Sequence, residues 1–362
     1  MKEKIPVGIL GATGMVGQQY IRLLDNHPWF QVVYCAASPR SAGKKYGVAV
    51  GQRWHVYGEI PDYVADSIVE DASDVDRAAA RCALVFSAVD MEKKLVAALE
   101  ESYAQQGVAV VSNNSAHRWT RDVPMIIPEI NAGHLESIRL QRCRRGWGRG
   151  LLVVKSNCSI QSYMTPLYAL IKAGYGVDKM FVTMLQALSG AGYPGPSAFD
   201  LTDNVVPFIN GEEEKSENEP LKILGELSDE GIVNARFPKI SVHCNRVPVL
   251  HGHTACVSIG FADKKPDLQE IRRIWNDFRG EAQILELPSA PFCPISVRNE
   301  MDRPQPRIDR ECGNGMTVSV GRIRSCPVTD VRFVGLHHNT IRGAAGGCIL
   351  TAELIKAKGY LD

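Results

Sequence analysis

Short apolar runs alternate with amphipathic segments through the first half of the chain. Four of these runs predict strands, at residues 5–10, 31–37, 83–87 and 108–112. Between them, apolar residues recur at helical spacing over 15–25 and 91–107. Alternation of strand and helix is typical of a parallel sheet covered by helices on both faces. The first half is therefore predicted to be an α/β, Rossmann-like unit.

The pattern changes after residue 158. Longer strand-like stretches follow, separated by loops and a few helices, at 179–188, 239–242, 253–261 and 315–322. This arrangement predicts a second domain of the α+β class. Small residues dominate the segment 339–358, which its apolar spacing predicts to be one helix able to pack closely against another element.

The composition is that of a globular protein of about two domains, because 45% of the 362 residues are hydrophobic. A net charge of +1 gives no field that would favour nucleic acid. We expect the basic run 139–149 to be a solvated loop between domains, with a site for an anionic partner as the alternative. No apolar stretch approaches the roughly 20 residues that cross a membrane. The chain enters its first strand at once, so we expect no targeting segment and a cytoplasmic protein.

Ten cysteines are scattered along the chain without a Cys-x-x-Cys pair, which indicates free thiols and no metal site. Cys158 differs from the others in its context. It follows the apolar run 151–154, and from Ile160 onward apolar residues recur at helical spacing. We therefore expect Cys158 in the first turn of a helix, where free backbone N–H groups and the helix dipole favour the nucleophilic thiolate.

A glycine-rich segment, 8–17, lies between the first predicted strand and the first helix. Gly14 and Gly17 occupy the last two positions of the dinucleotide-binding Gly-x-Gly-x-x-Gly fingerprint, which serve close approach to a pyrophosphate and helix–sheet packing. Ala12 replaces the first glycine, and a plain strand–helix turn is the alternative interpretation. The predicted cofactor contacts in this segment are Gly11, Thr13, Gly14, Met15 and Val16.

The end of the second predicted strand indicates which dinucleotide is bound. An acidic residue there would bind the ribose hydroxyls of NAD, but residues 35–45 contain neither Asp nor Glu. Ser38, Arg40 and Ser41 would instead hydrogen-bond a 2′-phosphate. We therefore predict NADP as the cofactor, with a solvated basic turn as the alternative interpretation.

A nucleophilic cysteine needs a partner for proton transfer and anchors for its substrate. His251 and His253 would face different ways in an extended segment, and spacing alone does not distinguish them. Arg246 would hold a carboxylate with two parallel hydrogen bonds. The cluster from Glu212 to Lys215 is interpreted first as an exposed helix start, and alternatively as a site for an amine and an anion.

Nine short motifs, taken together and in order, resemble the aspartate-semialdehyde dehydrogenase family, and the resemblance is closest to its archaeal and fungal branch. The motifs are GATGMVG, SPRSAGKKY, SNNSAHR, VPMIIPEIN, SNCS, LQALSGAGYPG, DNVVPFINGEEEK, NRVPVLHGHT and HNTIRGAAGG. They cover essentially the whole chain. The resemblance implies an NADP-binding, Rossmann-like domain over 1–156, completed by a C-terminal helix at 338–362, and a catalytic and dimerisation domain over 157–337.

The resemblance also implies roles for the candidate residues. Cys158 would be the nucleophile and His253 the acid/base. Arg246 would bind the α-carboxylate of the substrate, Glu212 its amino group and Lys215 its phosphate. The residues implied to bind phosphate or to order the site are Arg118, Asn157 and Gln186. Those implied to surround the nicotinamide are Ser189, Gly190 and Asn339.

The implied activity is the NADP-dependent reductive dephosphorylation of L-4-aspartyl phosphate to L-aspartate 4-semialdehyde through a cysteine thioester, in lysine, threonine and methionine biosynthesis. The implied partners are this small-molecule substrate and further copies of the chain, in a homodimer or homotetramer. One alternative is an acyl-CoA reductase that forms malonate semialdehyde. That relative lacks the E-E-x-K pattern and the Asn before the cysteine, both of which this chain retains. The other alternative is a non-catalytic NADP-binding protein, which the intact thiol, histidine and anchors disfavour.

Overall fold

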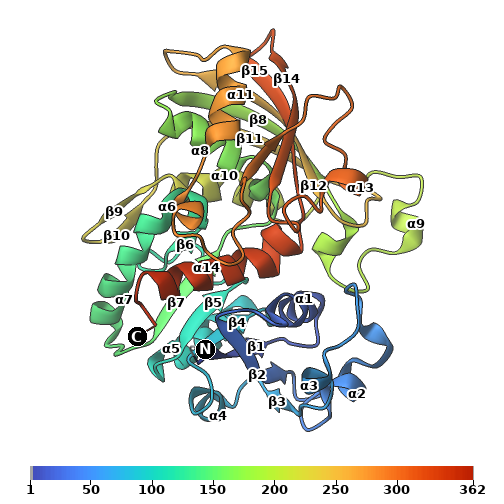
Figure 1. The fold of residues 1–362 in the computed structure, drawn as a ribbon, viewed down its shortest axis with the longest axis vertical. Helices are drawn as coiled ribbons and strands as arrows, with labels where there is room; N and C mark the ends of the chain where they lie inside the picture. The colour runs from blue at the N-terminus through green and yellow to red at the C-terminus, as the bar shows by residue number, and fades with distance from the viewer. Residues whose placement is uncertain (1–2, 362) are drawn as a thin grey trace.

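The computed structural model describes residues 3–361 and contains two large sheets, one above the other in Figure 1. The lower sheet has seven strands in the order β3-β2-β1-β4-β5-β7-β6, and every neighbouring pair is parallel. Its strands are β1 Ile5–Leu10, β2 Phe30–Ala37, β3 Val69–Asp71, β4 Leu84–Ser87, β5 Ala109–Ser112, β6 Met125–Ile126 and β7 Leu151–Lys155. The α/β prediction for the first half of the chain is confirmed.

Side chains of this parallel sheet alternate between two hydrophobic cores, so its strands are buried on both faces. In β1, Ile9 joins one core and Leu10 the other. Helices α1 Met15–Leu24 and α14 Gly346–Ala357 contribute to the first core, and α5 Lys93–Gln105 contributes to the second. Although α14 comes last in the sequence, it returns to contact β5 and β7 (Figure 1). The other helical segments of this half are α2 Tyr46–Val50, η1 Gly51–Arg53, α3 Asp62–Ala65, α4 Val75–Ala79, α6 Pro128–Asn131, η2 Ala132–Glu136 and α7 Ser137–Arg145.

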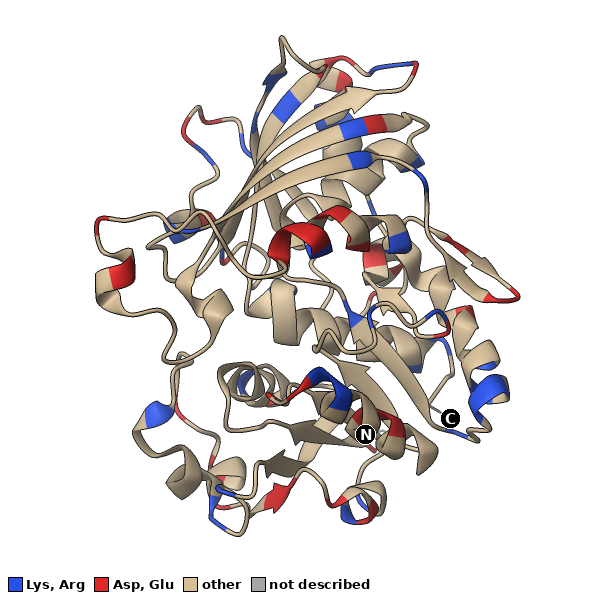
Figure 2. Cartoon of the chain, turned by 180° about the vertical axis from the view of Figure 1, so that it is seen from behind, with Lys and Arg blue, Asp and Glu red and all other residues tan. Residues whose placement is uncertain are grey.

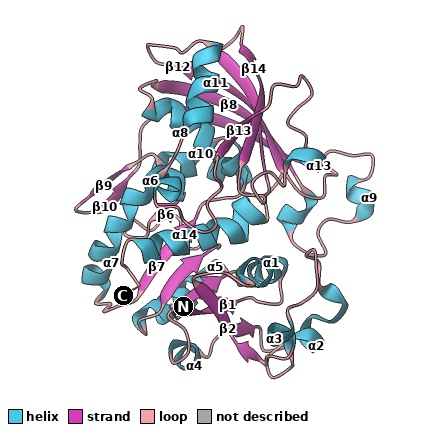
Figure 3. Ribbon diagram, viewed as in Figure 1, coloured by secondary structure: helices cyan, strands magenta, loops and turns pink. Residues whose placement is uncertain are grey.

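The upper sheet has six strands in the order β11-β8-β12-β15-β14-β13 and is mixed, because β8 runs parallel to β11 and antiparallel to β12. Its strands are β8 Val177–Gln186, β11 Lys239–Arg246, β12 His253–Phe261, β13 Ile295–Val297, β14 Val318–Ser325 and β15 Val331–His337. Helices α8 Met164–Lys172 and α11 Leu268–Asp277 pack against it (Figure 3). The Trp275 indole donates to the Pro166 carbonyl and lies against Phe333. The α+β prediction for the second half is also confirmed.

The remaining elements of the second half are short, except for the twelve-residue α10. They are η3 Ser159–Ser162, η4 Leu188–Ala191, α9 Ala198–Leu201, α10 Glu212–Ile223, β9 Glu226–Ser228, β10 Gly231–Val233, α12 Glu281–Ile284, α13 Pro306–Asp309 and η5 Ile341–Ala345. Figure 2 shows the acidic start of α10 in red, near the middle of the molecule. Within residues 3–361, no helix combines the length and the apolar character needed to cross a membrane.

Most of the basic run 139–149 is helical, which corrects the prediction of a solvated loop between domains. Helix α7 continues to Arg145 and ends where Gly146 adopts a left-handed conformation with φ of 64°. Arg145 pairs with Asp122 and Glu101, each at 2.6 Å. This arginine is therefore neutralised within the fold and offers no site for an anionic partner.

The single helix predicted over 339–358 is interrupted. A π-helical turn, η5, comes before α14, and Ala344 within it has non-helical angles of φ −142° and ψ −105°. Arg342 in this turn is buried and donates to the carboxylate of Glu129 at 2.8 Å. The break therefore coincides with a contact to a distant segment, which the local spacing of apolar residues does not reveal.

Strand boundaries also differ from the predictions by a few residues. The strand predicted over 315–322 begins at Val318, because three consecutive residues with positive φ, 313–315, form a turn. The strand predicted over 239–242 continues to Arg246, since β11 pairs with β8 along its whole length. This extension brings Arg246 beside Gln186, at the ends of two parallel strands.

Candidate active site

Cys158 follows β7 by three residues and precedes a single turn of 3₁₀ helix, η3. At Tyr163 the backbone leaves the helical region, with φ of −133°, and α8 begins only at the next residue. The Asn157 side chain carbonyl accepts hydrogen bonds from the backbone N–H and the hydroxyl of Ser159, which fixes the turn locally. The predicted place in the first turn of a longer helix is therefore wrong in detail, because a one-turn helix stands between Cys158 and α8.

The surroundings of Cys158 do not favour the thiolate in the way that the sequence predicts. Burial is the largest influence and, with the Glu212 carboxylate, raises the pKa of the thiol to about 11. The nearby cations Lys155, Arg118 and Arg246 act in the opposite direction. The effect of burial on the pKa of Cys158 is therefore larger than any lowering of this pKa by the short helical turn.

His253, the first residue of β12, is the histidine that meets the thiol. Its Nε2 lies 3.4 Å from the Cys158 Sγ, and its Nδ1 accepts a hydrogen bond from the Ala187 backbone N–H at 3.0 Å. Because Nδ1 is an acceptor, the neutral ring carries its hydrogen on Nε2. Burial, followed by Arg246, lowers the pKa of His253 to about 3. At neutral pH this imidazole therefore acts toward the sulfur as a hydrogen-bond donor.

His251 points elsewhere. Its Nδ1 lies 2.9 Å from the Ser189 hydroxyl, and its ring stacks on His338 at 5.3 Å between centroids. Asn339 donates to the same Ser189 hydroxyl at 2.8 Å, and its side chain carbonyl accepts the Gly252 N–H. The structure thus brings together the predicted nicotinamide residues Ser189 and Asn339.

Gly190 lies directly against the catalytic candidates. A Cβ on this glycine would come within 3.0 Å of both an Arg246 guanidinium nitrogen and the His253 Cε1. Arg246 is largely buried, and this nitrogen donates to the Ala187 carbonyl at 2.6 Å. The absence of a side chain at position 190 therefore allows the loop after β8 to pack onto His253 and Arg246.

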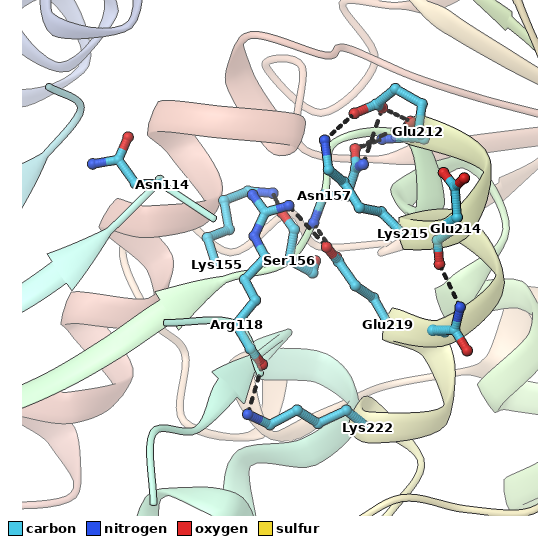
Figure 4. Close-up of polar contacts among 12 residues, drawn as sticks. Asn114, Arg118, Lys155, Ser156, Asn157, Glu212, Glu214, Lys215, Glu219 and Lys222 are labelled. Atoms are coloured by element: carbon cyan, nitrogen blue, oxygen red, sulfur yellow. Dashed lines mark hydrogen bonds and ion pairs between the residues drawn. The ribbon is translucent and has the colours of Figure 1, made fainter. Parts of the chain in front are cut away.

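Glu212 is the centre of a hydrogen-bond cluster beside Cys158 (Figure 4). Its carboxylate accepts four hydrogen bonds at 2.8–3.2 Å, from Asn157, Ser159, Gln186 and Lys215. Burial acts to raise the pKa of Glu212, but Lys215 and the other donors lower it to about 2. Glu212 begins helix α10, as predicted, but the prediction that it is exposed is wrong, because its charge faces the site.

One face of α10 continues the cluster with residues that the sequence analysis missed. Glu219 is fully buried, pairs with Arg118 at 2.8 Å and accepts the backbone N–H of Asn157 at 2.5 Å. Lys222 donates to three backbone carbonyls, including that of Arg118 at 2.7 Å (Figure 4). The sequence did offer a signal for these residues, because charged side chains recur at spacings of three and four, as on one face of a helix. They are Glu212, Lys215, Glu219 and Lys222.

The glycine segment before α1 has the geometry of a phosphate-binding turn. Gly11 has φ of 82°, and a Cβ on Gly17 would approach the Gly11 carbonyl oxygen to 2.3 Å. The N-cap, Gly14, is exposed and no side chain caps α1, so the first N–H groups of the helix are free for an anion. A cavity of about 570 Å³ lies alongside and is lined in part by Met15, His251 and Thr340.

The other predicted cofactor residues lie on this side of the parallel sheet. Thr13, Met15 and Val16 are partly exposed around the start of α1. Ser38 and Arg40 are exposed in the turn after β2, with Ser41 partly exposed beside them. These groups fit a dinucleotide whose pyrophosphate meets α1 and whose adenosine lies at the end of β2. Within residues 3–361, no cluster of three His, Cys, Asp or Glu side chains is arranged to hold a metal ion.

Two family models match the chain. Residues 6–138 match the NAD binding domain of semialdehyde dehydrogenases, and residues 167–342 match their dimerisation domain. Curated relatives include the aspartate-semialdehyde dehydrogenase of Archaeoglobus fulgidus, 44% identical over 96% of this chain and 97% of the relative. That of Cryptococcus neoformans is 42% identical over all of this chain and 99% of the relative.

A solved structure extends the similarity to three dimensions. The Candida albicans aspartate semialdehyde dehydrogenase, crystallised with NADP, superposes with a TM-score of 0.89 at 39% identity, covering 98% of this chain and 99% of that one. The Vibrio cholerae aspartate semialdehyde dehydrogenase II, at 23% identity and a TM-score of 0.75 over 98% of this chain and 99% of that one, shares the fold. Taken with the two family models and the full-length relatives, this similarity shows that the chain belongs to the aspartate-semialdehyde dehydrogenase family.

Proposed function

We propose that this chain catalyses the NADP-dependent reductive dephosphorylation of L-4-aspartyl phosphate to L-aspartate 4-semialdehyde. The observation that carries the proposal is the contact of the Cys158 Sγ with the His253 Nε2 at 3.4 Å, with an ionised Glu212 and the Arg246 guanidinium around the same thiol. A thiol, a hydrogen-bond donor and two oppositely charged anchors match an amino-acid acyl phosphate.

In this mechanism the Cys158 thiolate attacks the acyl carbon and phosphate leaves, so that a thioester remains. When bound, NADPH would supply the hydride that reduces this thioester to a thiohemiacetal. The C–S bond then breaks, which releases the aldehyde and returns the Cys158 thiolate.

The Ala187 N–H holds the His253 ring by donating to its Nδ1. The Nε2–H of the same ring donates to the Cys158 sulfur, and to the carbonyl oxygen of the substrate as negative charge develops on that oxygen. The resemblance implies that His253 acts both as an acid and as a base. The tautomer with its hydrogen on Nε2 supports the first of these roles, the donation of a hydrogen bond or proton.

The charged groups around the thiol are matched to the charges of the substrate. Arg246 would hold the α-carboxylate and Glu212 the α-ammonium group. Arg118 and Lys215 would hold the phosphate. The proposed task of Asn157 and Gln186 is to orient Glu212, to which both donate.

Arg246→Lys is expected to lower kcat/KM by about 100-fold, because an ammonium cannot make the parallel hydrogen bonds of a guanidinium to a carboxylate. Steady-state kinetics with aspartate semialdehyde, phosphate and NADP measure the effect. NADP affinity, followed by fluorescence, serves as the control and should not change. A variant with wild-type kcat and KM would remove Arg246 from the substrate site.

Arg40→Ala is expected to raise the KM for NADP about tenfold and to leave that for NAD unchanged, because only NADP carries the 2′-phosphate. Lys45→Ala is a matched control, since this exposed lysine lies in the same segment but pairs with Asp66 at 2.8 Å. Equal losses with NADP and NAD would show that Arg40 does not read the 2′-phosphate.

The direct test of the function is NADPH formation from aspartate semialdehyde and phosphate by the purified protein. Malonyl-CoA with NADPH, assayed in parallel, tests the acyl-CoA reductase alternative. Absence of turnover in both assays, despite NADP binding, would support a non-catalytic protein instead. Aspartate semialdehyde as the sole productive substrate is the expected result.

We further propose that the chain forms a homodimer or homotetramer, which the match to the family's dimerisation domain supports. We also propose that it acts in the cytoplasm. The proposed domains are 1–156 with 338–362, and 157–337, of which residues 1, 2 and 362 lie outside the described part. The division is supported by the sheets, since β1 to β7 form the first large sheet and β8 with β11 to β15 form the second, while α14 returns to the first.

A further inference from the structure

Strand β11 lies at the edge of the upper sheet, beside β8. In a parallel pair of strands, the N–H groups of alternate residues face the partner strand and the others face away from it. In β11 the N–H groups of Val242, Cys244 and Arg246 face away from β8 and donate to acceptors outside the sheet. The elements that supply these acceptors are therefore held against the strand that carries Arg246.

Two of the three acceptors are carboxylates on helix α10. Glu213 accepts the Cys244 N–H at 3.0 Å, and Glu217 accepts the Val242 N–H at 3.1 Å. The remaining N–H, that of Arg246, donates to a backbone carbonyl in the loop before α10 at 2.8 Å. Glu213 and Glu217, called here the edge carboxylates, thus occupy the place that a further strand would take along this part of β11.

The spacing of the edge carboxylates matches the spacing of the N–H groups that they accept. Four residues of an α-helix advance about 6 Å along its axis, and two residues of a strand advance about 6.6 Å. Because the earlier glutamate bonds the later strand residue, α10 runs opposite to β11. A shift of one residue along the strand would break both hydrogen bonds, since the next N–H faces β8. The edge carboxylates therefore fix the register between the helix and the strand.

The first turn of α10 directs its three consecutive glutamates to three different places. Glu212 accepts hydrogen bonds from the two residues that flank Cys158. Glu213 accepts a hydrogen bond from β11, and Glu214 is exposed to solvent. The helix therefore connects the turn that carries Cys158 with the strand that carries Arg246.

The two proposed substrate anchors lie next to this contact, one on the helix and one on the strand. Glu212 directly precedes Glu213, and Arg246 follows Cys244 by two residues. One amino-acid substrate has to reach both anchors, with its α-ammonium group at Glu212 and its α-carboxylate at Arg246. A displacement of roughly 1 Å between such groups can cost about 100-fold in rate. The register of α10 on β11 is therefore expected to control how well the substrate is held.

We propose that Glu213 and Glu217 are positioning residues, which set the separation between Glu212 and Arg246 by holding α10 in register with β11. They act on the substrate only through these two anchors. If the edge carboxylates served only to cover the sheet edge, their loss would lower stability without a specific effect on substrate binding. The inference rests on the proposed function, because that function assigns the two charges of the substrate to Glu212 and Arg246.

Backbone hydrogen exchange, followed at single residues, tests the contact without any substrate. Glu213→Ala removes the acceptor, so the Cys244 amide should exchange at least about tenfold faster than in the wild type. Glu213→Gln removes the charge but keeps the reach and an acceptor oxygen, so the Cys244 amide should still exchange slowly. Glu217→Ala should have the corresponding effect at Val242, one helical turn farther along α10, and takes the place of Glu213→Ala if that variant does not fold.

Steady-state kinetics test the effect on the anchors. Glu213→Ala is expected to lower kcat/KM for aspartate semialdehyde about tenfold, mainly through KM, and to leave the KM for NADP unchanged. Glu213→Gln should stay within about threefold of the wild type, because its hydrogen bond remains. Glu214→Ala is the matched control, since it removes the same charge from the same helical turn but from an exposed side chain, and it should change neither exchange nor kinetics. The melting temperature of each variant reports whether it is folded.

Three results would overturn the proposal. Unchanged exchange at Cys244 in folded Glu213→Ala would show that the contact does not hold the helix. Faster exchange with an unchanged KM for aspartate semialdehyde would make the edge carboxylates a cover for the sheet edge alone. Equal kinetic losses in Glu213→Ala and Glu213→Gln would assign the effect to charge instead of register. Absence of turnover by the wild type would refute the proposed activity, and the anchors with it, while the exchange data would still report on the contact.

Discussion

Cys158→Ser is expected to lower kcat by about 10⁴-fold or more, while NADP binding stays intact. A serine hydroxyl ionises far less readily than a thiol and needs a strong base to become a nucleophile. At this position the nearest ring nitrogen is the His253 Nε2, which carries a hydrogen because Nδ1 accepts the Ala187 N–H. The variant would therefore have a donor where it needs an acceptor.

The measurement is NADPH formation under saturating substrates, with NADP affinity determined separately. Cys143→Ser is a suitable control, because this cysteine is exposed on α7 and has no part in the site. It should retain full turnover. A Cys158→Ser variant with more than a tenth of the wild-type kcat would contradict the thioester mechanism.

His253→Ala is expected to lower kcat by about 10²–10³-fold, in the range of a lost acid/base or oxyanion contact. The change removes the only histidine that touches the Cys158 sulfur within residues 3–361. It also leaves the Ala187 N–H, now bonded to Nδ1, without its partner. Both changes destabilise the transition state, in which negative charge moves from the sulfur to the carbonyl oxygen.

His251→Ala supplies the comparison, since it removes an equal volume two residues away. His251 contacts Ser189 and His338 rather than the thiol, so its loss should fall mainly on the KM for NADP and leave kcat within about tenfold. Parallel kinetics of the two variants give the ranking. If His251→Ala lost more kcat than His253→Ala, the assignment of the two histidines would have to be exchanged.

The parallel sheet could be predicted from the sequence because its strands are continuous apolar runs separated by helices. The predictions failed where a distant contact decides the backbone. Arg342 binds Glu129 across more than two hundred residues of sequence, and the π-helical turn that holds it interrupts an otherwise helical pattern. Arg145 likewise finds Asp122 and Glu101 only in the folded state, so its basic run resembles a solvated loop in the sequence.

The site divides in the same way. The sequence motifs identify Cys158, Glu212 and Arg246 as site residues, but they do not predict the protonation state of these side chains in the folded protein. The sequence predicts a thiolate at a helix start, whereas burial favours the neutral thiol. The acidic start of α10 faces inward, because four side chains donate hydrogen bonds to the Glu212 carboxylate. The sequence gives no sign that Lys155, the last residue of β7, is buried, because lysine side chains usually lie at the protein surface.

The return of α14 to the parallel sheet has a consequence for the order in which the protein is made. The ribosome completes β1 to β7 before any strand of the second sheet, yet the face shared by α1 and α14 stays only partly covered until residues 346–357 have emerged. The first sheet therefore cannot mature as an independent unit during synthesis. The part of its apolar face over β5 and β7, which includes Val153, lacks α14 until the whole of the second sheet has been translated, and apolar surface left exposed in this way favours aggregation.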